Sequence, residues 1–237
     1  MSITYNCWHG CHKKSEGCKN CYVYRRDESI GKDSNVVYKT SFYNLPIRKN
    51  RDGSYKYKSG TEFDMCFSSD FFIEEADEWR AGVLEMIKER SDCDFMCITK
   101  RPERILECIP DIDTYDNLII YCTMENQRRF NERAPIYLNL PLKTKGIMIE
   151  PMLERIDMSK YLDKDIDIIA VGGESGPNAR ILDFNWVKEI KKLCDKKGIS
   201  FYFHQTGAKL LVDGKLYNID RKYQHSQARK AFKDHCH

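Results

Sequence analysis

The stretch NLIIYCTMENQRRFNER, residues 117–133, contains the two elements that recur through the rest of the chain. Residues 117–126 form a short, nearly continuous apolar run with a polar end, which is typical of a strand buried in a parallel sheet. A helical-looking segment, Gln127 to Arg133, follows without a break. The stretch therefore predicts a strand followed directly by a helix.

The same order of strand and helix recurs on both sides of this stretch. The other predicted strands are SITYN (2–6), EFDMCFSSD (62–70), DFMCITKR (94–101), KGIMIEP (145–151), DIIAVGGES (167–175) and SFYFHQTG (200–207). The other predicted helices span 74–90, 102–108 and 185–197. About seven such units predict an α/β fold with parallel strands, a complete or partial (β/α) barrel.

Two segments do not follow this pattern. Residues 31–60 are polar, with an Asp-Gly turn signal at 52–53, and we expect them to be an insertion. Residues 208–237 contain a second Asp-Gly signal at 213–214 and a basic end. We therefore expect a barrel domain over 1–207, followed by a hairpin and helix extension over 208–237.

Composition limits the location and partners of the protein. Lys and Arg number 39 against 36 Asp and Glu, so stable nucleic-acid binding is not expected. No apolar run reaches roughly 18 residues and the N-terminus lacks a signal-peptide pattern, so we expect a cytoplasmic protein without a membrane anchor. In that setting the 11 cysteines favour metal binding or redox chemistry over disulfides.

Polar residues end the predicted strands. Because the carboxyl ends of parallel strands meet at one edge of a sheet, these residues form a candidate site. They are Ser68, Ser69, Asp70, Thr99, Lys100, Arg101, Glu125, Asn126, Gln127, Glu150, Gly172, Gly173, Glu174, Ser175, His204 and Gln205. The loop after the first strand brings cysteines to the same edge.

The cysteine loop allows two interpretations. Cys7, Cys11, Cys18 and Cys21 have spacings that suit a four-thiolate zinc site. Cys11, Cys18 and Cys21 alone, spaced C-x6-C-x2-C, suit a 4Fe-4S cluster with one iron left open. A chain long enough to have its own hydrophobic core has less need of a zinc staple, which favours the cluster.

Seven motifs support the cluster interpretation and are spread over most of the chain. They are GCHKKSEGCKNCY (10–22), FSSDFF (67–72), ITKRPERI (98–105), MENQRRFNERAP (124–135), IEPML (149–153), GGESGPNAR (172–180) and FYFHQTG (201–207). Through them the chain resembles a family of small radical S-adenosylmethionine proteins found in phage and prophage sequences. The family's cysteines match Cys11, Cys18 and Cys21, whereas Cys7 stands where the family has a proline. His204 and Thr206 also depart from the usual lysine and tryptophan.

The resemblance implies a cofactor and a reaction. The cofactors are a 4Fe-4S cluster and S-adenosyl-L-methionine, which yields a 5′-deoxyadenosyl radical when a flavodoxin- or ferredoxin-type partner supplies an electron. A narrower resemblance is to clostridial queuine lyases, which convert queuine to 7-aminomethyl-7-deazaguanine in queuosine salvage for tRNA modification. It implies a radical SAM lyase acting on a small purine-like substrate. The alternative is a zinc-stapled nucleic-acid-binding or adaptor protein that uses Cys7 as its fourth ligand.

The strand-end residues receive roles by position. Cofactor binding is expected of Tyr22, Ser68, Ser69, Asp70, Thr99, Lys100, Arg101, Glu125, Asn126 and Gln127. Substrate binding is expected of Glu150, Gly172, Gly173, Glu174, Ser175, His204 and Gln205. His204 is also the candidate for catalytic proton transfer. The plainer interpretations are a helix cap for Asp70 and a satisfied core histidine for His204.

Overall fold

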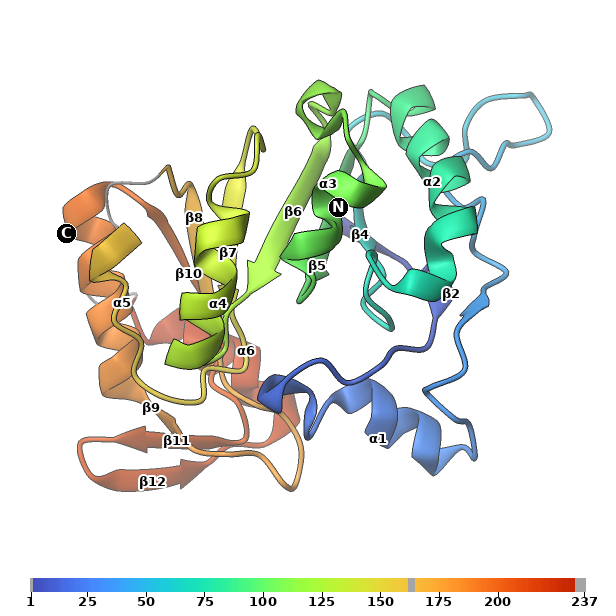
Figure 1. Cartoon of the computed structure of the whole chain (residues 1–237). Helices are drawn as coiled ribbons and strands as arrows, with labels where there is room; N and C mark the ends of the chain where they lie inside the picture. Colours follow the sequence, from blue (N-terminus) through green and yellow to red (C-terminus); the bar gives the residue numbers. More distant parts are fainter. Residues whose placement is uncertain (1, 162–164, 233–237) are drawn as a thin grey trace. The chain divides into compact units, whose positions relative to one another are not determined.

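The computed structural model describes residues 2–161 and 165–232. The chain folds as two compact units, whose elements are drawn in Figure 1. The first unit comprises residues 2–14, 23–122 and 139–144. The second comprises residues 15–22, 123–138 and the described residues from 145 onward.

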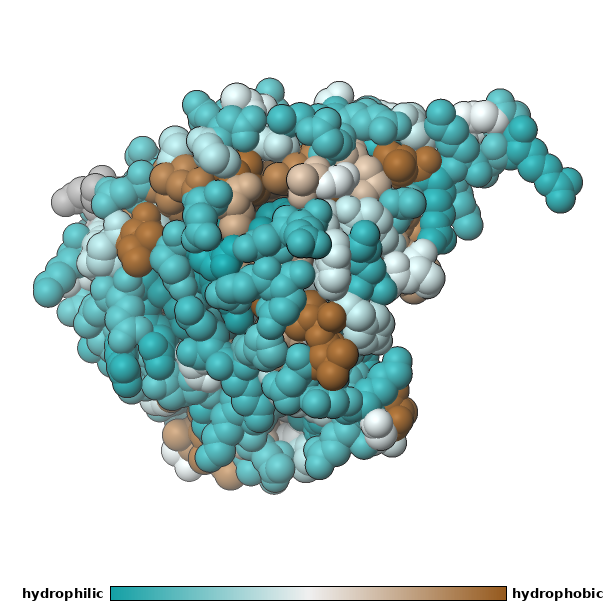
Figure 2. All heavy atoms as spheres, turned by 45° about the vertical axis from the view of Figure 1, so that its right-hand side comes forward, coloured by the Kyte–Doolittle hydropathy of each residue, from teal (hydrophilic) through white to brown (hydrophobic). Residues whose placement is uncertain are grey.

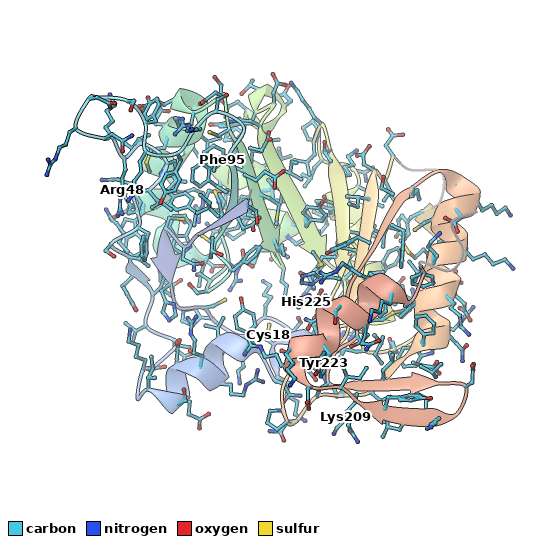
Figure 3. The ribbon with its side chains drawn as sticks, turned by 180° about the vertical axis from the view of Figure 1, so that it is seen from behind. Cys18, Arg48, Phe95, Lys209, Tyr223 and His225 are labelled. Carbon is cyan, nitrogen blue, oxygen red and sulfur yellow. The ribbon has the colours of Figure 1, made fainter. Side chains whose placement is uncertain are left out.

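Four parallel strands form the sheet of the first unit. In sheet order they are β1 (Ser2–Tyr5), β4 (Glu62–Met65), β5 (Asp94–Thr99) and β6 (Leu118–Thr123). Phe63 and Phe95 are direct neighbours in the register, and their fully buried rings stack with centroids 5.0 Å apart. Figure 3 labels Phe95 on its strand. Burial of these apolar side chains is what holds the strands together.

Helices and a short ribbon complete the first unit. The helices are α1 (Tyr22–Ser29), η2 (Glu74–Ala76), α2 (Asp77–Glu89), η3 (Pro102–Arg104), α3 (Ile105–Cys108) and η4 (Ile112–Thr114). The two-residue strands β2 (Trp8–His9) and β3 (Tyr38–Lys39) pair antiparallel. The Thr40 N–H also donates to the Cys7 carbonyl at 3.1 Å. The segment 31–60 is thereby attached to the chain that follows β1.

Three parallel strands form the larger sheet of the second unit. They are β7 (Lys145–Ile149), β8 (Ile168–Gly172) and β10 (Ser200–Gln205), in that order. The pairing of β10 with β8 shifts register between Phe203 and Gln205. His204 therefore lies at an irregularity of the strand, which is a common way to redirect a side chain.

The remaining elements of the second unit follow local sequence signals. They are η1 (Glu16–Cys18), α4 (Gln127–Tyr137), η5 (Ser159–Tyr161), β9 (Leu182–Asp183), α5 (Phe184–Lys197), β11 (Lys209–Val212), β12 (Lys215–Asn218) and α6 (Arg221–Lys230). The Asp183 side chain caps α5, and Gly198, at φ 71°, ends it. β12, β11 and β9 form a small sheet, in which Figure 3 labels Lys209.

The predicted α/β class is confirmed. Each of the seven parallel strands lies inside a predicted apolar run, four in the first unit and three in the second. The helix α1 was not predicted, because its buried residues are only Val23 and Asp27 and its apolar periodicity is therefore weak. The predicted segment 208–237 contains β11, β12 and α6, while residues 233–237 lie outside the described residues.

The surface seen in Figure 2 is mostly hydrophilic, with hydrophobic residues in separate patches. Within the described ranges, every helix is too short or too polar to cross a bilayer.

Candidate functional site

Cys7 is separated from the other cysteines of its loop by burial. Its side chain has no exposed surface, and its Sγ lies 3.1 Å from Sγ of Cys66. Burial, reinforced by the hydrogen bond with Cys66, raises the pKa of the Cys7 thiol well above its usual value. Cys7 is therefore a neutral, enclosed thiol, and a metal ligand must be a thiolate.

The three cysteines of the C-x6-C-x2-C motif are all partly exposed. Cys11 belongs to the first unit, and Cys18 and Cys21 belong to the second. Figure 3 labels Cys18 on the segment that leads into α1. Over residues 2–161 and 165–232, no three His, Cys, Asp or Glu side chains are placed together as a metal site. Binding of a cluster by these three thiols therefore stays a prediction.

In the first unit, the ends of β4 and β5 hold the backbone on both sides of Cys11. The Gly10 N–H donates to the Ser68 carbonyl at 3.2 Å, and the Ser69 hydroxyl donates to the Gly10 carbonyl. The Arg101 guanidinium donates to the carbonyl of His12 at 3.5 Å. Ser69 and Arg101, predicted as cofactor-binding residues, thus position the segment that carries Cys11.

Asp70 is the centre of a buried hydrogen-bond cluster at the same strand ends. Its carboxylate accepts from the Thr99 hydroxyl at 2.8 Å and from the Lys100 N–H at 3.0 Å. It also accepts from Arg101 Nη1 and from the Phe72 N–H, both at 3.0 Å. The structure brings Asp70, Thr99 and Arg101 together, with the carboxylate already bonded to four protein donors.

In the second unit, Glu125 holds the segment that precedes Cys18. The carboxylate is fully buried and accepts from the Ser15 hydroxyl and from the Gly17 N–H, the latter at 3.2 Å. Arg133 Nη1 neutralises it at 2.7 Å. A Cβ at Gly17 would lie 2.9 Å from Glu125 Oε1, so this approach favours a residue without a side chain.

Glu174 holds Asn20, one of the two residues between Cys18 and Cys21. It accepts from Asn20 Nδ2 at 2.9 Å and from three groups of Arg180: the backbone N–H at 2.9 Å, Nε at 3.0 Å and Nη2 at 2.6 Å. Burial opposes ionisation, but the hydrogen bonds from Arg180 and Asn20 outweigh it and lower the pKa of Glu174. Two charged carboxylates at strand ends therefore fix the segment with Cys18 and Cys21.

Glu150, Gly172, His204 and Gln205 meet at the ends of β7, β8 and β10. His204 Nδ1 lies 2.7 Å from Glu150 Oε2, and Gln205 Nε2 donates to the other carboxylate oxygen. A Cβ at Gly172 would clash with the Glu150 carboxylate, so the glycine makes room for it. The hydrogen bond to Glu150 raises the pKa of His204 despite its burial. The His204 side chain keeps 39% of its surface exposed, so a ligand has access to this pair.

α6 packs against this cluster. His225 Nδ1 donates to the His204 carbonyl at 3.0 Å, and the two imidazole rings are 4.7 Å apart. Thr206, beside them, is buried, and its N–H donates to the Gln224 carbonyl at 3.2 Å. His225, labelled in Figure 3, was not predicted as a site residue, because nothing in the sequence marks which face of α6 lies on β10.

The other predicted residues lie in the following places. Asn126 caps α4 by accepting from the Arg129 N–H at 2.8 Å, and the Gln127 N–H donates to Glu154 at 2.8 Å. Both residues therefore take part in hydrogen bonds that stabilise the first turn of α4. The remaining predicted positions are Tyr22, exposed at the start of α1, Gly173, buried against Thr206, and Ser175, half-buried after Glu174.

Comparison with known proteins and protein families identifies the family of this chain. The searches of curated proteins and of solved structures found no significant match. A family model described as a protein of unknown function, DUF5131, matches residues 1–233. Because this match covers nearly the whole length, the chain belongs to the DUF5131 family.

Proposed function

We propose that the protein is a radical S-adenosylmethionine enzyme in which Cys11, Cys18 and Cys21 would hold a 4Fe-4S cluster. The observation that carries the proposal is the accessibility of the thiols. All three motif cysteines are partly exposed, whereas Cys7 is enclosed against Cys66. Within the cysteine loop, three partly exposed thiols beside one enclosed thiol match the donor set of a cluster that keeps one iron open.

The other described cysteines support the same assignment. Five besides Cys7 are buried, which is the usual state of a cysteine that acts as a small hydrophobic residue: Cys66, Cys93, Cys97, Cys122 and Cys194. Cys108 is partly exposed, but Arg80 and Arg104 donate to its sulfur. The buried Cys7 also weighs against the zinc-stapled alternative, which requires it as a ligand.

When bound, the cluster would supply the electron, received from a flavodoxin- or ferredoxin-type donor, that cleaves S-adenosylmethionine and starts radical chemistry. The chain's own contribution is positional. Ser69 and Arg101 fix the backbone around Cys11, and Glu125 and Glu174 fix the segment of Cys18 and Cys21. Rigid support of this kind is what a site with a demanding ligand geometry requires.

We further propose that the reaction is that of a queuine lyase. Support comes from the sequence resemblance and from the cluster of Glu150, His204 and Gln205. A carboxylate suits the N–H and amino donors of a purine-like base. Glu150 is the better candidate for this role than Glu174, because Glu174 already accepts from four donor groups of Asn20 and Arg180. His204, whose pKa is raised, would hold a proton at Nδ1 or Nε2 and deliver it to the product.

The first experiment is anaerobic reconstitution with iron and sulfide, followed by measurement of iron content and of absorbance at about 400 nm. We expect about four irons per chain in the wild type, in Cys7→Ala and in the matched control Cys108→Ala, and loss of iron in Cys18→Ala. With S-adenosylmethionine and dithionite, the wild type should release 5′-deoxyadenosine. A colourless protein with zinc that is lost in Cys7→Ala would overturn the proposal.

The substrate is tested in the same assay with queuine added. If the lyase assignment is correct, queuine increases the yield of 5′-deoxyadenosine and 7-aminomethyl-7-deazaguanine appears in the mixture. Release of 5′-deoxyadenosine that queuine does not affect would remove the lyase assignment and leave the radical chemistry standing.

A further inference from the structure

α6 covers the free edge of β10, the last strand in the sheet order of the second unit. The Gln224 carbonyl accepts from the Thr206 N–H at 3.2 Å, and His225 Nδ1 donates to the His204 carbonyl at 3.0 Å. These bonds stand where a further strand would pair with β10. The helix therefore holds the edge strand at the residues that belong to the candidate site.

The bond from His225 matters because the ladder with β8 does not fix His204. The register pairs Phe203 and Gln205 with successive residues of β8 and passes over His204. A residue at such an irregularity is not held in place by regular strand pairing. The hydrogen bond from α6 therefore supplies the support that the sheet lacks at this position.

The imidazole of His204 is oriented by Glu150. Nδ1 of the ring lies 2.7 Å from Oε2 of Glu150, so the carboxylate favours a proton on Nδ1. Within the described ranges the structure gives Nε2 no partner, and 39% of the side chain is exposed. Nε2 is therefore the atom through which His204 would exchange a proton with a ligand.

His225 supports His204 through its ring as well as through its hydrogen bond. A carbonyl oxygen can only accept, so Nδ1 of His225 carries the hydrogen of that bond. The two imidazole rings pack edge to face, with centroids 4.7 Å apart and planes inclined at 61°. This contact limits the rotation of the His204 ring away from Glu150.

The ionisable side chains that contact the His204 ring come from three elements: Glu150 after β7, Tyr202 on β10 and His225 on α6. β8 and α5 meet β10 here through uncharged residues, Gly172 and Phe184. The cations of α6 are exposed: Arg221, Lys222, Arg229 and Lys230. Glu150 stabilises the His204 imidazolium, whereas a protonated His225 opposes it. Charge alone and positioning therefore predict opposite effects for the loss of His225.

We propose that His225 is a positioning residue for His204: its hydrogen bond to the His204 carbonyl keeps Nδ1 on Glu150 and leaves Nε2 to give a proton to the product. In that step a basic atom of the product takes the proton with its lone pair, and the Nε2–H bond breaks. Neutral imidazole remains, bonded to Glu150 through Nδ1. This role rests on the proposed function, in which His204 delivers the proton.

Two substitutions separate the hydrogen bond from the ring charge. His225→Asn removes the ionisable ring but keeps an amide N–H near the place of Nδ1, whereas His225→Phe keeps a ring and removes the donor. NMR titration of the full chain, without reconstitution, measures the pH midpoint of the His204 imidazole in each variant. We expect a lower midpoint in His225→Phe than in His225→Asn, because Nδ1 then moves off the carboxylate that raises the pKa of His204. The matched control is Gln227→Ala, an exposed position of α6, which should titrate as the wild type does.

Glu150→Gln gives the midpoint of a His204 that has lost its carboxylate, and circular dichroism checks that each variant is folded. In the reconstituted protein, His225→Phe should form product at least about tenfold more slowly than His225→Asn, at equal iron content. Equal midpoints in the two variants, or equal rates, would overturn the positioning role. The titration needs neither the cluster nor queuine, so a failed reconstitution would remove the proposed function without changing the titration result.

Discussion

Glu125 accepts a hydrogen bond from the backbone N–H of Gly17 at 3.2 Å, although 108 residues separate them in the sequence. This bond joins the strand-end carboxylate to the middle residue of η1, one residue before Cys18. The carboxylate is fully buried and paired with Arg133, so its position is fixed from both sides. The segment that bears the candidate ligands is therefore built into the fold.

Removing this carboxylate should be costly. Glu125→Ala leaves the buried Arg133 unpaired and the Gly17 N–H without its acceptor, so we expect about 3–5 kcal/mol of lost stability. Urea unfolding followed by circular dichroism measures it. Glu132→Ala, which removes an exposed carboxylate on α4 next to Arg133, should cost at most about 1 kcal/mol. Equal unfolding midpoints for the two variants would contradict the role of Glu125.

Gly10 should tolerate no side chain. Its φ of 95° disfavours other residues, and a Cβ there would clash with the backbone carbonyl of Val36. Gly53 has a similar φ of 85° with nothing near its Cβ position, so Gly53→Ala controls for backbone strain alone. We expect Gly10→Ala to lose at least about 1 kcal/mol more than Gly53→Ala in urea unfolding. If Gly10→Ala lost no more stability than Gly53→Ala, the loop before Cys11 would be able to shift and accommodate a side chain.

The pair of His204 and Glu150 makes stability depend on pH. Because the folded pKa of His204 is raised, the pair's contribution is complete below the unfolded value of about 6.5 and is lost as pH rises through the folded pKa. Between about pH 6 and about pH 9, the wild type should therefore lose more stability than Glu150→Gln. Urea midpoints across this range test it, and parallel curves would rule out the pair as a titrating unit.

Reactivity should separate the cysteines of the N-terminal loop. In the metal-free protein, iodoacetamide should label Cys11, Cys18 and Cys21 within the time that leaves Cys7 and Cys66 unmodified, because the latter two are buried. Peptide mass spectrometry gives the order of labelling. Addition of urea should expose Cys7 to the reagent. Labelling of Cys7 as fast as Cys18 in the native protein would remove the main argument for a three-thiolate site.

The sequence was sufficient to predict the sheet, and the reason is physical. Strands whose two faces are buried or half-buried, such as β6 and β8, have nearly continuous apolar sequences, and their polar ends follow directly. The gathering of Glu150, His204 and Gln205 follows from the parallel order of their strands. The polar strand ends of the second unit therefore lie together as the pattern predicted, while their function as a site stays a prediction.

The partners of the strand-end carboxylates were not predictable in the same way. Ser15 and Gly17 are more than 100 residues from Glu125, and no periodicity links them. One local signal was available: Arg133 lies eight residues after Glu125, and Arg180 lies six residues after Glu174. An arginine that close to a buried acid indicates a paired carboxylate, which is a structural anchor more often than an open ligand.

The central claim, three thiolates with one open iron, is tested most directly by electron paramagnetic resonance of the reconstituted and reduced protein. Addition of S-adenosylmethionine should change the spectrum in the wild type and equally in Cys7→Ala, because under the proposal the added molecule would bind the open iron and Cys7 would take no part. A spectrum that S-adenosylmethionine leaves unchanged, or a cluster that disappears in Cys7→Ala, would contradict the account.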